Sequence, residues 1–206
     1  MWNSMKRKRS VRNRRARRCL FLILLALLAL LLMWPRTVHL EGLVSPYAIL
    51  VDADSGEAVA EKEADVSIYP ASMTKVMTAL LALEANPDLE QPVTLPEDIF
   101  PELRAEGASM AGFRPGETAT VRDLLYGALL PSGAECCEAL AREVSGSEEA
   151  FVELMNQKAA ELGMRSTHFC NPTGLHDPEH ISTVRDMARL LRAAMQNETF
   201  RSILSA

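Results

Sequence analysis

The chain has 206 residues, of which 48% are hydrophobic, and this is enough for one sizeable domain with a packed core. Nine of its 22 basic residues precede Cys19, so 13 basic and 27 acidic residues follow Arg18, a net charge of −14 that the whole-chain value of −5 conceals. This acidic balance argues against nucleic-acid binding, and we expect no nucleic-acid partner for the main domain.

The first 46 residues predict an export segment and a spacer. Residues 1–18 predict a basic cytoplasmic tail, and residues 19–34 are an uninterrupted run of apolar residues that ends in Trp34. Sixteen helical residues span about 24 Å, which suits a signal-peptide h-region or a short membrane anchor. Positive charge stays on the cytoplasmic side, so we expect an extracytoplasmic domain at the cell membrane, or a secreted one if the signal is cleaved. No Ala-x-Ala site follows Trp34, which favours an uncleaved signal anchor, and residues 35–46 predict the spacer.

The cysteines leave two alternatives open. Cys136, Cys137 and Cys170 are an odd number in a region expected to be exported, so either of the first two could pair with Cys170, or all three could be buried thiols. No spacing resembles a zinc site, because the three histidines after residue 160 lack a matching thiolate pair. We therefore expect no metal.

Residues 47–206 predict one domain that opens with a hairpin. Strands over 47–53 and 57–61 flank a tight turn, and we expect the next helix to lie against them. Residues 93–113 contain several prolines and glycines and predict an irregular segment of the kind that often lines binding sites. Capping residues and breakers then predict helices over 121–130, 135–144, 148–162 and 184–195, with a loop over 166–175.

The segment Tyr69 to Glu84 carries the clearest chemistry. Apolar residues recur at helical spacing from Met73 to Leu83, which predicts a buried helix beginning near Ser72. Ser72 and Lys75 are one turn apart, so their side chains emerge on one face, about 5–6 Å apart at Cβ. A serine hydroxyl is a weak nucleophile, and a neutral amine beside it can take its proton. The N–H groups at the start of the helix suit a developing oxyanion.

Four segments occur in a specific order along the chain. They are Tyr-Pro-Ala-Ser-Met-Thr-Lys at 69–75, Gly-Ala-Ser-Met at 107–110, Asp-Leu-Leu-Tyr-Gly-Ala-Leu-Leu-Pro-Ser-Gly at 123–133, and Thr-His-Phe-x-Asn-Pro-Thr-Gly-Leu at 167–175. In combination they closely resemble the D-alanyl-D-alanine carboxypeptidases, which are low-molecular-weight penicillin-binding proteins of the serine β-lactamase superfamily. The resemblance runs from about Tyr47 to the end of the chain.

The resemblance implies an α/β (α+β) fold of the β-lactamase/transpeptidase type and a role for each matching residue. It implies Ser72 as the acylated nucleophile, Lys75 as its general base and Ser132 as a proton relay. It also implies substrate contacts at three further positions, namely Ser109, Met110 and Gly133. The substrate would be a peptidoglycan stem peptide ending in D-Ala-D-Ala, β-lactams would act as inhibitors on the same serine, and no cofactor is implied.

Two departures from the family pattern lead us to expect a truncated and impaired enzyme. Ala134 stands where the family has asparagine, so one positioning contact is lost. No Lys-Thr-Gly occurs in the sequence, and we expect the C-terminal strands of the sheet to be missing, leaving mostly helices and the N-terminal hairpin. Without that segment we expect Lys75 to be protonated and solvated, and the chain to be weakly active or inactive.

Other interpretations remain open. The chain could be a non-catalytic, membrane-tethered peptidoglycan-binding module, which Ala134 favours, or a β-lactamase-like hydrolase, although no Glu-x-x-x-Asn follows the third helix. An anchored helical protein with accidental motifs is the remaining alternative. Ser132 could simply cap a helix after Pro131, His168 is expected to be a packed loop residue, and Asp186 is expected to serve the first turn of its helix.

Overall fold

The computed structural model describes residues 38, 40 and 42–206. The basic tail, the apolar segment 19–34 and Cys19 lie outside the described residues, so the expectations for them stay predictions. The chain divides into two units, residues 1–38 and 39–206, and the second contains all the elements described below. None of the helices in the described part combines the length and hydrophobicity that crossing a bilayer requires.

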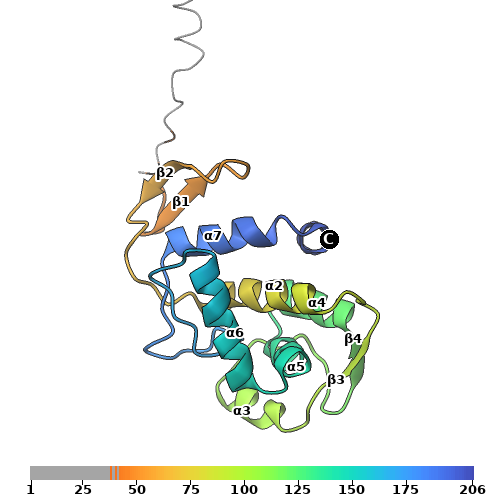
Figure 1. The fold of residues 1–206 in the computed structure, drawn as a ribbon. Helices are drawn as coiled ribbons and strands as arrows, with labels where there is room; N and C mark the ends of the chain where they lie inside the picture. Colours follow the sequence, from red (N-terminus) through yellow and green to blue (C-terminus); the bar gives the residue numbers. More distant parts are fainter. Residues whose placement is uncertain (1–37, 39, 41) are drawn as a thin grey trace, which may run out of the picture. The chain divides into compact units, whose positions relative to one another are not determined.

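Helix α2 (Lys75–Ala85) is the centre of the second unit, as Figure 1 shows. One turn of 3₁₀ helix, η1 (Ala71–Thr74), leads into it, so the helix predicted to begin near Ser72 starts with a tighter turn. All residues of α2 from Met77 to Leu83 are buried. A helix that is apolar on every side needs neighbours on every side, and α2 is accordingly surrounded by other helices.

Five helices pack around α2. They are α4 (Val121–Leu129), α5 (Ala134–Ser145), α6 (Glu148–Glu161), α7 (Val184–Ala194) and α8 (Glu198–Leu204). The first four agree with the predicted ranges to within one or two residues, whereas α8 was not expected. Four fully buried phenylalanines from different segments fill the spaces between them, namely Phe100, Phe151, Phe169 and Phe200.

Side-chain caps explain why the helix starts were predictable. Thr120 Oγ1 accepts a hydrogen bond from the backbone N–H of Asp123, and the Asp123 carboxylate accepts one from the N–H of Thr120, which completes a capping box. Ser147 and Thr183 cap α6 and α7 through their hydroxyl oxygens. Such caps satisfy N–H groups that a helix leaves unpaired, so their residue types recur at helix starts.

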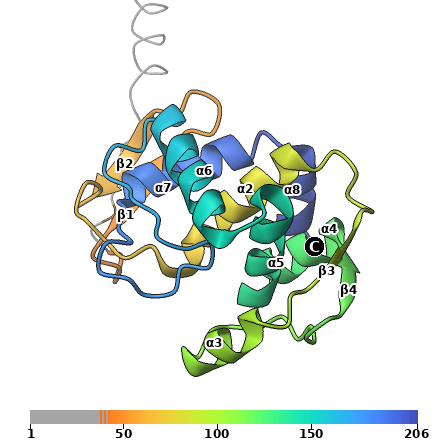
Figure 2. The ribbon, with the colours of Figure 1, turned by 60° about the horizontal axis from the view of Figure 1, so that its bottom comes forward.

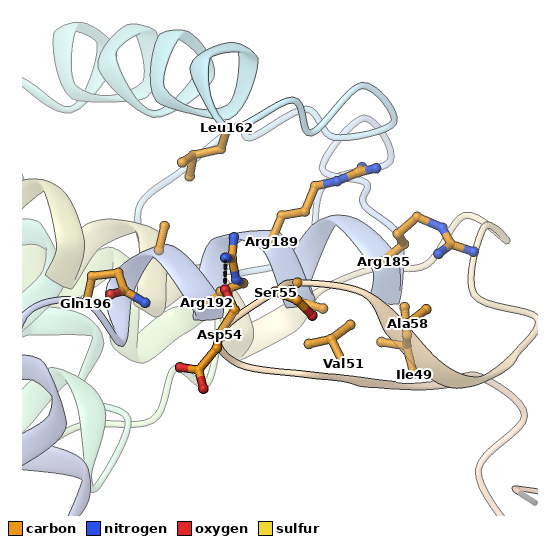
Figure 3. Close-up of a pocket in the computed structure, with 13 residues that line it drawn as sticks. Ile49, Val51, Asp54, Ser55, Ala58, Leu162, Arg185, Arg189, Arg192 and Gln196 are labelled. Carbon is orange, nitrogen blue, oxygen red and sulfur yellow. Dashed lines mark hydrogen bonds between the residues drawn. The ribbon is translucent and has the colours of Figure 1, made fainter. Parts of the chain in front are cut away.

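The predicted hairpin forms from β1 (Ala48–Val51) and β2 (Ala58–Lys62), which pair antiparallel with an irregularity between Leu50 and Val51. The hairpin packs on α7 and not, as predicted, on the Ser72 helix. Figure 3 shows Arg192 of α7 beside the hairpin turn, where it donates to the carbonyls of Ala53 and Asp54. Arg185 of α7 also forms ion pairs with Glu61 of β2 and with Asp65, so two arginines of α7 join this helix to the hairpin segment.

The segment predicted to be irregular, residues 93–113, is only partly so. It contains α3 (Ile99–Ala105), and β3 (Pro92–Thr94) pairs antiparallel with β4 (Thr118–Thr120). In Figure 2 these three elements lie at the end of the unit away from β1 and β2. The prediction was wrong for residues 99–105, because Pro101 lies in the first turn of α3, where a helix tolerates proline, and the three-residue strands are too short to show an alternating pattern. Buried Val93, Phe100 and Leu103 tie the segment to the core.

Candidate active site

Ser72 lies on η1 with its side chain exposed, so its hydroxyl can be reached from solvent. Two polar side chains converge on it. Ser132 Oγ donates to Ser72 Oγ over 2.8 Å, and Lys75 Nζ lies 3.2 Å from the same oxygen. The structure therefore brings together the three residues that the sequence analysis assigned to catalysis, although they come from segments 60 residues apart.

Lys75 is buried, with only 5% of its surface exposed. Its Nζ donates to the carbonyl of Thr173 over 2.6 Å in addition to its contact with Ser72. Burial lowers the pKa of Lys75, because the charged amine loses its hydration, while the charges of Cys137 and Glu135 oppose this shift. Burial also raises the pKa of Cys137 to about 12, so this thiol is neutral near pH 7 and its charge does not oppose the shift there.

The expectation of a solvated, protonated Lys75 is thus wrong on solvation. The side chain lies under the 171–175 loop, which supplies both its cover and its hydrogen-bond acceptor. A neutral amine offers two hydrogens and one lone pair. With one hydrogen on Thr173 O, the lone pair can face the Ser72 hydroxyl, which is the arrangement that a general base needs.

Ser132 does not cap a helix. The N-cap of α5 is Gly133, which makes no side-chain capping bond, and the Ser132 hydroxyl points to Ser72 instead. Ser132 also has φ +65°, a left-handed conformation that a residue with a side chain rarely adopts. Such strain persists where the surroundings fix it, and it is concentrated at functional sites.

Asn171 shapes the loop that covers Lys75. Its Oδ1 accepts from the backbone N–H groups of Thr173 and Gly174 and from the Thr173 hydroxyl, and its Nδ2 donates to Leu175 O. Thr78 of α2 fastens the loop from below by donating to Pro172 O over 2.6 Å. These bonds hold the Thr173 carbonyl where Lys75 meets it.

Gly174 is the point of closest approach between this loop and Ser72. A Cβ atom added to Gly174 would lie 1.9 Å from Ala71 O and 3.1 Å from Ser72 N. Gly174 has φ +79° and Ala71 has φ +48°, so both sides of this contact are in the left-handed region. The Thr-Gly pair was visible in the sequence, but nothing in the sequence indicated what the glycine would touch.

Sequence reasoning also missed Thr74 and His180, which form a buried contact behind Ser72. The N–H of Cys170 donates to His180 Nδ1 over 3.3 Å, so the neutral ring carries its proton on Nε2, 2.8 Å from Thr74 Oγ1. Burial lowers the pKa of His180 to about 4. His168 is exposed and joins Ile181 through a backbone bridge, so the expectation that it is a packed loop residue is wrong.

The segment 109–113 lies along the start of α5. Ser109 O accepts from Ala134 N over 2.8 Å, and Met110 packs partly against the core. Gly133 is buried where a Cβ would come within 2.6 Å of the Ala111 Cβ. The structure thus places Ser109 and Gly133 near Ser132, and the contact of Ser109, Met110 and Gly133 with substrate stays a prediction.

Two neighbours of Ser132 are fully enclosed. Ala134 is 1% exposed and Glu135 is completely buried. One carboxylate oxygen of Glu135 accepts from Gly112 N and Phe113 N, and its other oxygen has no partner among the described residues. Glu135 therefore holds the 112–113 backbone and does not replace the absent asparagine of the family pattern.

The structure also tests the predictions for the cysteines and for Asp186. Cys136, Cys137 and Cys170 are all free thiols, so the disulfide alternative is wrong. Asp186 is buried and does more than serve its own helix, because its Oδ2 accepts from Ser166 N and Thr167 Oγ1 and its Oδ1 contacts Arg189. It thereby joins α7 to the loop that precedes Phe169.

Comparison with known proteins identifies the family. The family model for D-alanyl-D-alanine carboxypeptidase matches residues 36–204. The chain is 38% identical over 152 residues to the D-alanyl-D-alanine carboxypeptidase DacF of Bacillus subtilis, covering 74% of this chain and 39% of that protein. It is 41% identical over 157 residues to DacC of Escherichia coli, covering 72% of this chain and 39% of that protein.

Solved structures give the same answer for the fold. A variant of the Streptomyces K15 DD-transpeptidase superposes with a TM-score of 0.74 at 32% identity, over 77% of this chain and 64% of that one. The D-alanyl-D-alanine carboxypeptidase of Mycobacterium tuberculosis superposes with a TM-score of 0.71 at 36% identity, over 79% and 60%. The predicted β-lactamase/transpeptidase-like fold is confirmed. The chain spans about two fifths of the length of DacF and DacC. Because the match covers most of this chain, the chain belongs to the D-alanyl-D-alanine carboxypeptidase family.

Proposed function

We propose that the protein is a serine-type D-Ala-D-Ala carboxypeptidase that acts on peptidoglycan stem peptides. The observation that carries the proposal is the convergence of Lys75 Nζ and Ser132 Oγ on Ser72 Oγ, at 3.2 and 2.8 Å, with the lysine buried and the nucleophile exposed. Family membership supports the choice of substrate, and it also supports β-lactams as inhibitors that acylate the same serine.

The first chemical step forms an ester on Ser72. Neutral Lys75 accepts the hydroxyl proton as Ser72 Oγ attacks the carbonyl carbon of the penultimate D-alanine. The C–N bond to the last D-alanine then breaks, and the leaving amine takes a proton delivered through Ser132. Free D-alanine departs, and water later hydrolyses the ester to regenerate the Ser72 hydroxyl.

The loop over 171–175 positions Lys75 for this reaction. Thr173 O fixes one N–H of Lys75, which leaves the lone pair free to face Ser72. The loop also excludes water from the amine, and this keeps the pKa of Lys75 below its ordinary value. The expectation that Ala134 and the absent Lys-Thr-Gly weaken the activity stays a prediction.

For cellular location, we propose that residues 19–34 anchor the chain in the cell membrane with the catalytic residues outside the cytoplasm. The nine cations before Cys19 and the apolar run after it support this orientation. Proteinase treatment of spheroplasts tests it. The domain should be digested without lysis, and protection until lysis would place it in the cytoplasm.

The enzymatic proposal is tested by incubating the full chain with a peptide ending in D-Ala-D-Ala and measuring free D-alanine. We expect release that Ser72→Ala abolishes. Peptide binding without D-alanine release in the unmodified chain would instead support the non-catalytic binding module. Fast turnover of a chromogenic cephalosporin would support the β-lactamase-like hydrolase.

A further inference from the structure

The loop that covers Lys75 also lines a cavity with a volume of about 290 Å³. Residues of α3, α5, the start of α6 and the loop up to Asp177 line it. Six of its lining side chains are carboxylates, and we call it the acidic cavity: Asp98, Glu102, Glu106, Glu138, Glu148 and Asp177. Asn171 and Thr173 of the covering loop line it, whereas Ser72, Lys75 and Ser132 do not.

The arginine that lines the acidic cavity already forms an ion pair with one of its carboxylates. Arg142 is the one arginine or lysine among its lining residues, and both of its contacts with a carboxylate go to Asp98, at 3.0 and 2.8 Å. Asp177 accepts from the N–H of Glu179. Glu102, Glu138 and Glu148 have no cation within ion-pair distance in the part of the chain that the structure describes.

Glu138 is the feature that points to a ligand. Only 5% of its surface is exposed, and this remaining surface borders the cavity. Its carboxylate makes no hydrogen bond and no ion pair with any described residue, although buried carboxylates are nearly always paired. A buried acid that faces a polar cavity from a rigid helix can gain its missing partner from a cation in that cavity.

We propose that the acidic cavity binds a hydrated divalent cation of the Mg²⁺ or Ca²⁺ type, with Glu138 as its buried carboxylate and Glu102 and Glu148 beside it. Oxygen donors alone are what these hard cations prefer. No three His, Cys, Asp or Glu side chains among the described residues are already arranged to ligate a metal directly. The contacts are therefore made largely through the water molecules that such ions retain.

Protonation supports this assignment. Burial raises the pKa of Glu138 to about 8, and the charges of Glu148, Glu102 and Asp98 add to the rise while Arg142 opposes it. Burial also raises the pKa of Glu148. Glu138 is therefore mostly protonated at pH 7, and a bound cation displaces that proton. Cation binding must then strengthen as the pH rises toward 8.

Thermal unfolding of the full chain in detergent tests the proposal. CaCl₂ or MgCl₂ is compared with NaCl at equal ionic strength, for the unmodified chain, Glu138→Gln and a control variant. Glu153→Gln is the control because Glu153 is exposed on the same helix as Glu148 and does not line the cavity. Glutamine resembles protonated Glu138 in shape and charge, so we expect Glu138→Gln to fold.

We expect the divalent salts to raise the Tm of the unmodified chain and of Glu153→Gln by roughly 3–6 °C at ten times Kd. Glu138→Gln should lose this rise. Calorimetric titration in two buffers of different ionisation enthalpy should show release of nearly one proton per cation at pH 7, absent in Glu138→Gln. A rise no larger than that in NaCl, or an equal rise in Glu138→Gln, would overturn the proposal. Neither result bears on D-alanine release, so the proposed function is tested independently.

Discussion

Replacing Gly174 by alanine tests how closely the covering loop fixes the nucleophile. The new Cβ would lie 1.9 Å from Ala71 O, and atoms in such contacts are essentially never nearer than 3.0 Å, so the two segments must separate by at least 1.1 Å. Ala71 precedes Ser72 directly, and a displacement of about 1 Å at a reacting group costs about 10²-fold in rate. We therefore expect acylation of Gly174→Ala by a fluorescent penicillin to be slower by about that factor.

Gly146→Ala is the matched control. Gly146 has φ +82°, close to the +79° of Gly174, but nothing lies within 4 Å of the Cβ that it would gain. Both variants therefore carry the same left-handed cost of roughly 1–2 kcal/mol in unfolding free energy. Only Gly174→Ala adds the overpacking cost of about 1–3 kcal/mol, which lowers its Tm by at least about 2 °C more. Equal acylation rates and equal Tm values for the two variants would refute the close approach.

Three further predictions concern the groups around Ser72. Ser132→Ala and Ser132→Gly should both slow acylation by about 10²-fold or more. The glycine variant should be about 1 kcal/mol more stable to unfolding than the alanine variant, because glycine relieves the strain at φ +65°. An unchanged acylation rate in either variant would show that Ser132 takes no part in the reaction. The acylation rate should rise with pH and level off above the pKa of Lys75, which burial lowers. Lys75→Arg should abolish this pH dependence, because arginine stays protonated. A pH-independent acylation rate in the unmodified chain would contradict a neutral lysine base. The pKa of His180 is about 4 in the folded chain and about 6.5 in the unfolded chain, so the unfolded chain binds more protons between these pH values. The contribution of neutral His180 to the free energy of unfolding, up to about 3 kcal/mol, is therefore present above pH 6.5 and lost as the pH falls toward 4. Urea unfolding from pH 7 to pH 4.5 should show a smaller loss of stability in His180→Gln, and parallel curves for the two proteins would contradict the prediction.

The sequence was sufficient for those parts of the fold that local chemistry determines. Caps at Thr120, Ser147 and Thr183 fixed three helix starts because their hydroxyls satisfy N–H groups within the same turn. The i, i+3 spacing of Ser72 and Lys75 likewise fixed their proximity before any tertiary contact was considered.

What the sequence could not supply are the contacts between distant segments. Lys75 looked solvated because its cover, Thr173, is 98 residues away, and the burial that lowers its pKa depends on that loop. The role of Gly174 depends on the position of the Ala71 carbonyl, and that of His180 on Thr74. Their individual residue types are compatible with ordinary loops, so only the tertiary arrangement distinguishes them.

The direction of the Ser132 side chain also could not be predicted from the local sequence. Its sequence context, just after Pro131 and before α5, fits a helix cap equally well. The hydroxyl reaches Ser72 because the residue adopts a left-handed backbone conformation, and this conformation is stabilised by neighbours that the local sequence does not include.

Peptide mass mapping after incubation with a β-lactam shows whether Ser72 is the nucleophile, because it detects even slow acylation and identifies the residue that reacts. We expect an adduct of one β-lactam mass on the peptide that contains Ser72, absent in Ser72→Ala and formed much more slowly in Lys75→Arg. An adduct on another residue, or one that persists in Ser72→Ala, would contradict this role of Ser72.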